Sequence, residues 1–146
     1  PIVVMHSIHA PVDPDAEIEY DDVVRDTLDA LSERVLLAEK AGLDRSQIIV
    51  DPGLGFGKKA TESFELLNRL GEFRSLGCPV LIGHSRKSMF GLVDADESAE
   101  RLAATVAASA LAAERGADIV RVHDVAENVA AVKTAAATED AGRLEE

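Results

Sequence analysis

Four polar segments of the sequence carry side chains that could bind or transform a ligand, and each follows an apolar run. They are Met5-His6-Ser7, Asp51, His84-Ser85-Arg86-Lys87 and Arg121-Val122-His123-Asp124. Arg121 and His123 lie two residues apart on an extended segment, so their side chains face the same side. Carboxylates accept hydrogen bonds and cations hold anions. Together these groups suit a ligand with a donor-rich heterocycle and an anionic leaving group.

The stretch VDPGLGFGKK, residues 50–59, passes from an apolar run into alternating glycines, with Asp51 at its lip. Its glycines permit positive φ and a close approach of the backbone to a ligand. A dinucleotide fingerprint would need a third glycine where Lys58 stands. A P-loop would need a glycine at Pro52 and Ser or Thr at Lys59. Both common phosphate loops are therefore excluded, and a turn without chemistry remains the alternative for this loop taken alone.

Apolar periodicity predicts four strands alternating with four helices. The strands are expected at 1–6, 47–50, 79–83 and 118–123, and the helices at 21–41, from a Thr61 cap to near Gly77, from a Ser98 cap to Gly116, and at 125–137. Residues 7–19 predict a long loop, and residues 138–146 a frayed tail. The fold class is α/β with parallel βα units, whose strands share one carboxyl edge. Four units are half of an eight-stranded barrel, or a small open sheet.

Composition limits the class of protein. The 146 residues fit one domain, 1–146, and carry a net charge of −12, which argues against nonspecific binding to nucleic acid or anionic membranes. No apolar run reaches the length of a membrane span, so a cytoplasmic location is expected. Only five of the 15 basic residues are Lys, which resembles the acidic surfaces of proteins from salt-loving organisms. The single Cys78 is predicted to be a buried structural thiol.

Three signatures resemble, in order, the C-terminal half of dihydropteroate synthases: VDPGLGFGKK, LIGHSRKSMFG, and SAERLAATVAASALAAERGADIVRVHDV, after an opening VVMH. The likeness runs from Pro1 to about Ala137. It implies the C-terminal half of a (β/α)₈ TIM barrel. It also implies a transferase of folate biosynthesis that joins hydroxymethyl-dihydropterin diphosphate to 4-aminobenzoate and releases diphosphate.

The resemblance assigns a pterin pocket to the first two strand ends. Asp51 is similar to the acid that holds the pterin ring. Gly55 and Phe56 resemble the residues that line the pocket beside it. Met5 resembles a methionine of the pocket wall. All four are therefore expected to bind substrate.

The last two strand ends carry the residues that the resemblance makes catalytic. Lys87 resembles the lysine between pterin and aminobenzoate, and Ser85 the serine near the aminobenzoate carboxylate. Arg121 and His123 resemble the pair that stacks on the pterin and binds diphosphate. The implied mechanism draws off diphosphate with these cations and Mg²⁺, and the aniline nitrogen then attacks the pterin methylene, without a covalent nucleophile. His84 stands where many relatives have an apolar residue and is interpreted as a substitution, not a ligand.

The family's first four βα units have no counterpart in the chain, and the resemblance places the Mg²⁺ ligand among them. The isolated chain is therefore expected to hold part of a site, to bind no metal of its own, and to be inactive. A homodimer or pairing with the missing half is expected, because half a barrel exposes strand edges. Two alternatives stay open: a methyltetrahydrofolate-dependent methyltransferase domain, and a non-catalytic half-barrel that binds or supports another protein. SRKS and RVHD favour the synthase, since methyl transfer has no diphosphate to bind.

Overall fold

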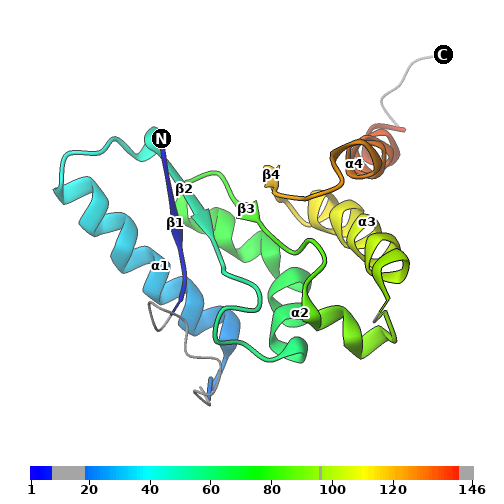
Figure 1. The fold of residues 1–146 in the computed structure, drawn as a ribbon. Coiled ribbons are helices and arrows are strands. Elements are labelled where there is room, and N and C mark those ends of the chain that lie inside the picture. The colour runs from blue at the N-terminus through cyan, green and yellow to red at the C-terminus, as the bar shows by residue number, and fades with distance from the viewer. Residues whose placement is uncertain (8–18, 96, 142–146) are drawn as a thin grey trace.

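The computed structural model describes residues 1–7, 19–95 and 97–141 of the chain. Strands and helices alternate in them, as the apolar periodicity predicts. The elements are β1 (Ile2–Met5), α1 (Val23–Lys40), β2 (Ile48–Asp51), α2 (Ala60–Asn68), β3 (Leu81–Ile82), α3 (Ser98–Glu114), β4 (Ile119–Val120) and α4 (Val125–Asp140) (Figure 1). Most of the loop predicted over residues 7–19 lies outside the described residues.

The described strands pair in parallel, in chain order. β1 pairs with β2 in the register that places Met5 opposite Asp51, and β3 pairs with β4. A parallel bridge between Val50 and Val80 links the two pairs. Because the strands run the same way, their carboxyl ends, and the polar segments that follow them, lie along one edge of the sheet.

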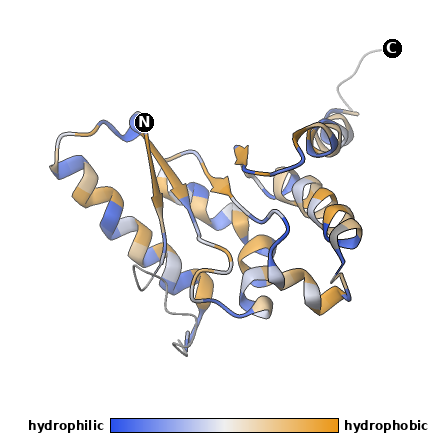
Figure 2. Cartoon of the chain, viewed as in Figure 1, coloured by the Kyte–Doolittle hydropathy of each residue, from blue (hydrophilic) through white to orange (hydrophobic). Residues whose placement is uncertain are grey.

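α1 covers the first two strands through an apolar face, while α4 packs against α3. The Asp22 carboxylate caps the first turn of α1 by accepting the N–H groups of Val24 and Arg25, both at 3.0 Å. Val24, Leu31 and Val35 then fall on one buried face, and the helix contacts β1 and β2. Figure 2 shows the strands as mostly hydrophobic, as expected of strands within a packed fold.

Two helix N-caps differ from the prediction. The N-cap of α2 is Lys59, two residues before the predicted Thr61, and the Glu62 carboxylate accepts its N–H at 2.6 Å. In α3 the N-cap position belongs to Glu97 and not to Ser98, and the Glu100 carboxylate accepts its N–H at 3.0 Å. In both helices a glutamate three residues along satisfies the exposed donor, so no hydroxyl cap is needed.

Other elements are shorter or longer than expected. The helix predicted to reach Gly77 ends at Asn68 and continues as a 3₁₀ segment, Leu70–Leu76. The last two strands have two residues each, shorter than the predicted runs 79–83 and 118–123. α4 continues to Asp140, three residues into the predicted tail, whose residues 142–146 lie outside the described residues.

Candidate active site

A cavity of about 160 Å³ lies at the carboxyl edge of the strands. Residues from all four strand ends line it: Met5, Asp51, Phe56, Gly83, Ser85, Lys87, Arg121 and His123. Every site residue named from the sequence lines it, except Gly55. A Cβ built on Gly55 would lie 3.5 Å from Lys87 Cδ, so Gly55 borders the cavity behind that lysine. The strand order thus brings together side chains that are far apart in sequence.

Asp51 closes β2 with a buried carboxylate at the floor of the cavity. Its side chain accepts the N–H of Gly53 at 2.8 Å. Burial raises the pKa of Asp51, while this N–H and the nearby charges of Lys87, Lys58 and Arg121 oppose the rise. Because burial deprives the carboxylate of hydrogen bonds from water, a ligand edge with N–H donors would supply them.

Lys87 reaches from the loop after β3 to the glycine loop after β2. Its Nζ donates to the Leu54 carbonyl and lies 4.5 Å from the centroid of the Phe56 ring, a cation–π distance. Burial lowers the pKa of Lys87, the Asp51 charge raises it and the Arg121 charge lowers it further. Lys87 lines the cavity together with Asp51, Phe56 and Arg121.

Ser85 joins the ends of β3 and β4 through a single hydroxyl. Its Oγ accepts the backbone N–H of His123 at 3.1 Å and lies 2.8 Å from His123 Nδ1. If the hydroxyl donates its own proton to Nδ1, the imidazole carries its proton on Nε2. This bond fixes the ring's orientation at the mouth of the cavity.

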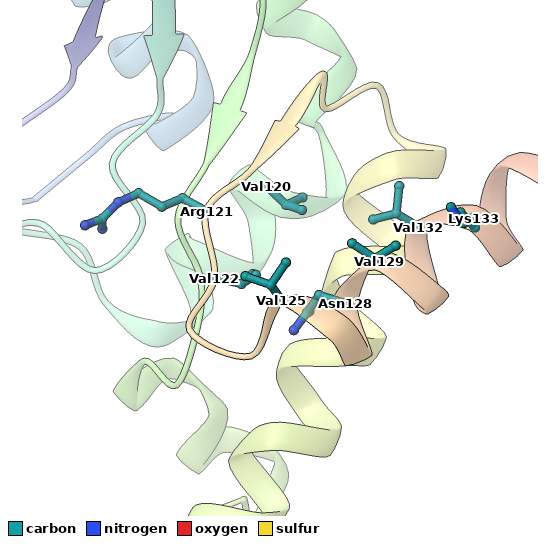
Figure 3. A pocket seen from close by; sticks show the side chains of 8 residues that line it. All are labelled: Val120, Arg121, Val122, Val125, Asn128, Val129, Val132 and Lys133. Carbon is teal, nitrogen blue, oxygen red and sulfur yellow. The ribbon is translucent and has the colours of Figure 1, made fainter.

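Arg121 faces the cavity, and its neighbours on the strand face away. Figure 3 shows its side chain extending to the opposite side from Val120 and Val122, which confirms the alternation read from the sequence. The two valines line a groove of about 490 Å³ between β4 and α4, which Arg121 also borders. The side chains of Arg121 and His123 are exposed, so the guanidinium and the imidazole are both open to a solvated anion.

Arg86, in the same cationic turn, does not line the cavity. It has a positive φ of 56° and forms a two-bond ion pair with Asp124, at 2.5 and 3.0 Å. Its backbone N–H donates to the Thr105 hydroxyl of α3 at 3.0 Å. Arg86 therefore holds the loop after β3 against the loop after β4, a structural role.

His84 is fully buried behind this loop. Its Nε2 lies 3.1 Å from the Thr105 carbonyl and 2.9 Å from Ser109 Oγ, and Ser109 in turn donates to Asn128 Oδ1 at 2.5 Å. Burial lowers the pKa of His84. Within the described residues, its buried Nδ1 has no hydrogen-bond partner. This side chain ties β3 to α3 and α4 and does not line the cavity.

Sequence reasoning missed two residues beside the site, Lys58 and His6. Lys58 Nζ lies 2.9 Å from His6 Nδ1 and donates to the carbonyls of Gly53 and Phe56 at 3.1 and 3.2 Å. Lys58 directly follows the glycines in sequence, and that position was the available signal. His6 was noted only as part of a polar strand end.

Neither a metal cluster nor a membrane helix occurs in the described part of the chain. No three His, Cys, Asp or Glu side chains there gather so as to hold a metal ion. None of its helices combines the length and apolar character that crossing a membrane requires. Cys78 is buried, and burial raises the pKa of its thiol, as expected of a structural cysteine.

Comparisons with known proteins agree on one family. The chain is 65% identical over 145 residues to a probable bifunctional folylpolyglutamate synthase/dihydropteroate synthase of Haloferax volcanii, covering 99% of this chain and 17% of that protein. It is 38% identical over 138 residues to the dihydropteroate synthase of Escherichia coli K12, covering 94% of this chain and 49% of that protein.

A solved structure gives the same result. The dihydropteroate synthase of Xanthomonas albilineans, in complex with 7,8-dihydropteroate, matches with a TM-score of 0.85 and 41% identity, over 95% of this chain and 52% of that one. The chain thus spans about half the length of the single-function synthases named here. The pattern described as "Pterin binding enzyme" matches residues 1–123, and the chain belongs to that family.

Proposed function

We propose that this chain forms half of a dihydropteroate synthase, which joins hydroxymethyl-dihydropterin diphosphate to 4-aminobenzoate and releases diphosphate. One observation carries the proposal. A buried carboxylate, a lysine and an Arg-His pair, each from a different strand end, line one cavity. The Xanthomonas synthase, solved with 7,8-dihydropteroate, supports the proposal, since that compound contains both a pterin and an aminobenzoate. The activity is proposed for a longer protein that contains this chain.

Asp51 and the glycine loop are proposed to bind the pterin. The amino-pyrimidine edge of a pterin offers neighbouring N–H donors, and a carboxylate accepts two of them at once. Burial has removed water from Asp51, so these bonds form in a site of low dielectric. The aromatic ring of Phe56 and the Met5 side chain line the same cavity and would contact the flat ring system.

Lys87 and Ser85 are proposed to bind between the two substrates. Lys87 Nζ already lies 4.5 Å from the centroid of the Phe56 ring in a cavity that Asp51 also lines, where it can contact the pterin and the incoming aminobenzoate. Ser85 lies on the opposite wall, beside His123, within reach of a carboxylate. Both side chains would orient the aniline nitrogen toward the pterin methylene.

Arg121 and His123 are proposed to stabilise the departing diphosphate. The carbon–oxygen bond of the pterin methylene breaks, and its electron pair leaves with the diphosphate. The aniline nitrogen then forms a bond to the carbocation-like methylene with its lone pair and loses a proton to water. Negative charge grows on the leaving oxygen, so the fixed guanidinium of Arg121 and a ring N–H of His123 beside it lower the barrier. No side chain of the chain needs to form a covalent bond.

Mg²⁺ is the metal that the family resemblance implies, and it would add charge to the diphosphate. The described residues do not fit it by themselves, because no three candidate ligands gather there. Any such site would need ligands from outside these residues. The roles proposed above therefore belong to side chains of this chain alone.

We also infer that the four βα units are half of a (β/α)₈ barrel. The first and last strands expose apolar side chains that a closed barrel would cover: Ile2 is 41% exposed, Val3 50% and Ile119 37%. The valine-lined groove between β4 and α4 lies beside the last of these strands (Figure 3). Such surface is rarely left in water, so the remaining half of the protein or a second copy of the chain is proposed to cover it.

Dihydropteroate formation tests the proposal. The full-length protein that contains this chain, assayed in molar salt with the pterin diphosphate and 4-aminobenzoate, should form dihydropteroate and release equimolar diphosphate. The isolated chain should form none, and mixing it with the separately produced remaining half should restore activity. Full-length protein that folds, by circular dichroism, and forms no dihydropteroate would overturn the proposal.

A further inference from the structure

Lys58 lies behind the wall of the cavity and does not line it. Its half-buried ammonium contacts three acceptors: the carbonyls of Gly53 and Phe56 and the Nδ1 atom of His6. The two carbonyls belong to the glycine loop, and His6 directly follows β1. One side chain thus connects the loop after β2 with the end of the neighbouring strand.

The glycine loop packs closely against the end of β1. A Cβ built on Gly53 would lie 2.0 Å from the His6 carbonyl oxygen. Gly53 O also accepts the N–H of Phe56 at 3.1 Å, which closes a tight turn. The Tyr20 hydroxyl donates to Gly57 O at 3.3 Å on the far side of the loop. With the bond from Lys87 to the Leu54 carbonyl, side-chain donors therefore hold four carbonyls of a segment rich in glycine, which has little stiffness of its own.

The proton count of the cluster is consistent with a charged lysine. An ammonium has three N–H groups, and three acceptors surround this one, so His6 Nδ1 accepts and its Nε2 carries the ring proton. Burial, with the charges of Lys58 and Arg34, lowers the pKa of His6 to about 4. Burial lowers the pKa of Lys58 to about 8; Lys87 and Arg34 also lower it, while Asp51 and Glu62 raise it.

The end of β1 is held from its other side as well. Arg34 of α1 donates to the carbonyls of Met5 and Ser7, the latter at 2.9 Å. The backbone on both sides of His6 is therefore bonded to α1, which holds His6 in place. A loop that Lys58 bonds to His6 is held in place with it.

We propose that Lys58 is a positioning residue, whose ammonium holds the glycine loop against His6. This contact fixes the Phe56 ring and the Asp51 carboxylate in the positions that bind the pterin. The proposal rests on the function proposed above for the cavity. Lys58 touches no substrate. It acts through Phe56, whose carbonyl it binds and whose ring forms the wall beside Lys87. A loop already held in place loses less conformational entropy when the ligand binds.

The test replaces Lys58 by Met in the full-length protein, with Lys59→Met as the matched control. Met keeps most of the apolar stem and removes all three donors, whereas Lys59 is exposed. Lys58→Met should speed hydrogen exchange of the amides of residues 54–57 by about tenfold, and should raise KM for the pterin diphosphate by about tenfold, with kcat within about threefold of the parent. Lys59→Met should match the parent in both.

The titration of His6 tests the proposal without an activity assay. In Lys58→Met, NMR titration of the His6 ring should show a pKa above the parent's value of about 4 yet below 6.5, since burial remains. His6→Leu should also loosen the loop, and His6→Asn, which keeps an acceptor near the Nδ1 position, should restore it. These variants keep the test decisive if Lys58→Met does not fold.

Parent-like loop exchange and KM in Lys58→Met, or equal loosening in Lys59→Met, would overturn the proposal that Lys58 holds the loop. Failure of the proposed function gives a different pattern. If the parent forms no dihydropteroate, the synthase proposal fails, while loop exchange and the His6 titration still decide whether Lys58 holds the loop.

Discussion

The two sides of the cavity are built differently. On the β1–β2 side the acid is buried, and Lys58 and Lys87 both donate to backbone carbonyls of the glycine loop. On the β3–β4 side Arg121 and His123 are exposed just after the short strand β4. The first side is held by close backbone packing and the second presents charge to solvent. A flat, neutral heterocycle needs the first kind of surface, and a hydrated anion needs the second.

The same contrast extends behind the cavity. The glycine loop is backed by the end of β1, which a Cβ on Gly53 would strike. The cationic side is backed by side-chain bonds, those of Arg86 with Asp124 and of His84 with Ser109. We therefore expect changes on the first side to act through the shape of the loop, and changes on the second to act through charge.

Gly53→Ala should have the largest effect. The added methyl meets the His6 carbonyl oxygen at 2.0 Å, so the loop or the strand end must move, and activity should fall by at least about a thousandfold. Gly42→Ala is the matched control, since its φ of 98° is also positive but its Cβ meets nothing within 4 Å. It should lower the free energy of unfolding by about 1–2 kcal/mol and leave KM unchanged. Equal effects of both changes on KM would contradict the tight packing described here.

Lys87→Ala and Arg121→Ala should come next, each with an intact fold. Loss of one charge-assisted contact to a developing charge costs about 3 kcal/mol, a rate loss of about a hundredfold. The assay is kcat/KM for dihydropteroate formation by the full-length protein, with circular dichroism as the check on folding. Lys40→Ala, at the exposed end of α1, is the control. Activity within about threefold of the parent would remove either residue from the proposed mechanism.

His6 should make stability fall in mild acid, a smaller effect. Its folded-state pKa of about 4 lies below the ordinary 6.5, so between these values the unfolded chain binds more protons than the folded one. The free energy of unfolding should therefore fall as pH drops from 6.5 toward 4, by about 2 kcal/mol at pH 5. Urea denaturation of the full-length protein at pH 7 and pH 5 measures it. In His6→Asn, which does not titrate there, the fall should be smaller by that amount, and an identical fall would refute the assignment.

Much of the fold follows from patterns within short segments. The four- and three-residue spacing of Val24, Leu28 and Leu31 predicts α1. The apolar runs before Asp51 and Arg121 predict parallel strands with one polar edge. Boundaries are harder, because they depend on which group satisfies the end of a helix. Glu62 and Glu100 do so from inside their helices, which moves the starts away from the hydroxyl residues that the sequence suggests.

The sequence predicted that Asp51, Lys87 and Arg121 would lie together, because each follows a strand and parallel strands share one carboxyl edge. The supports of the site were not predicted. Lys58 and His6 are 52 residues apart, and Ser109 and Asn128 are 19 apart, so only the packed fold brings each pair together. His84 was interpreted as a substitution and not a ligand, and its buried bonds to Thr105 and Ser109 give the physical reason that the sequence could not supply.

The most direct measurement is calorimetry on the full-length protein with two separate probes, hydroxymethylpterin without diphosphate and inorganic diphosphate. Asp51→Asn presents a mismatched amide edge, so it should weaken pterin binding by at least about tenfold and leave diphosphate binding within about twofold. Arg121→Ala should do the reverse. If both variants weaken the binding of the two probes equally, or of neither, the cavity is not divided between a pterin side at Asp51 and an anion side at Arg121.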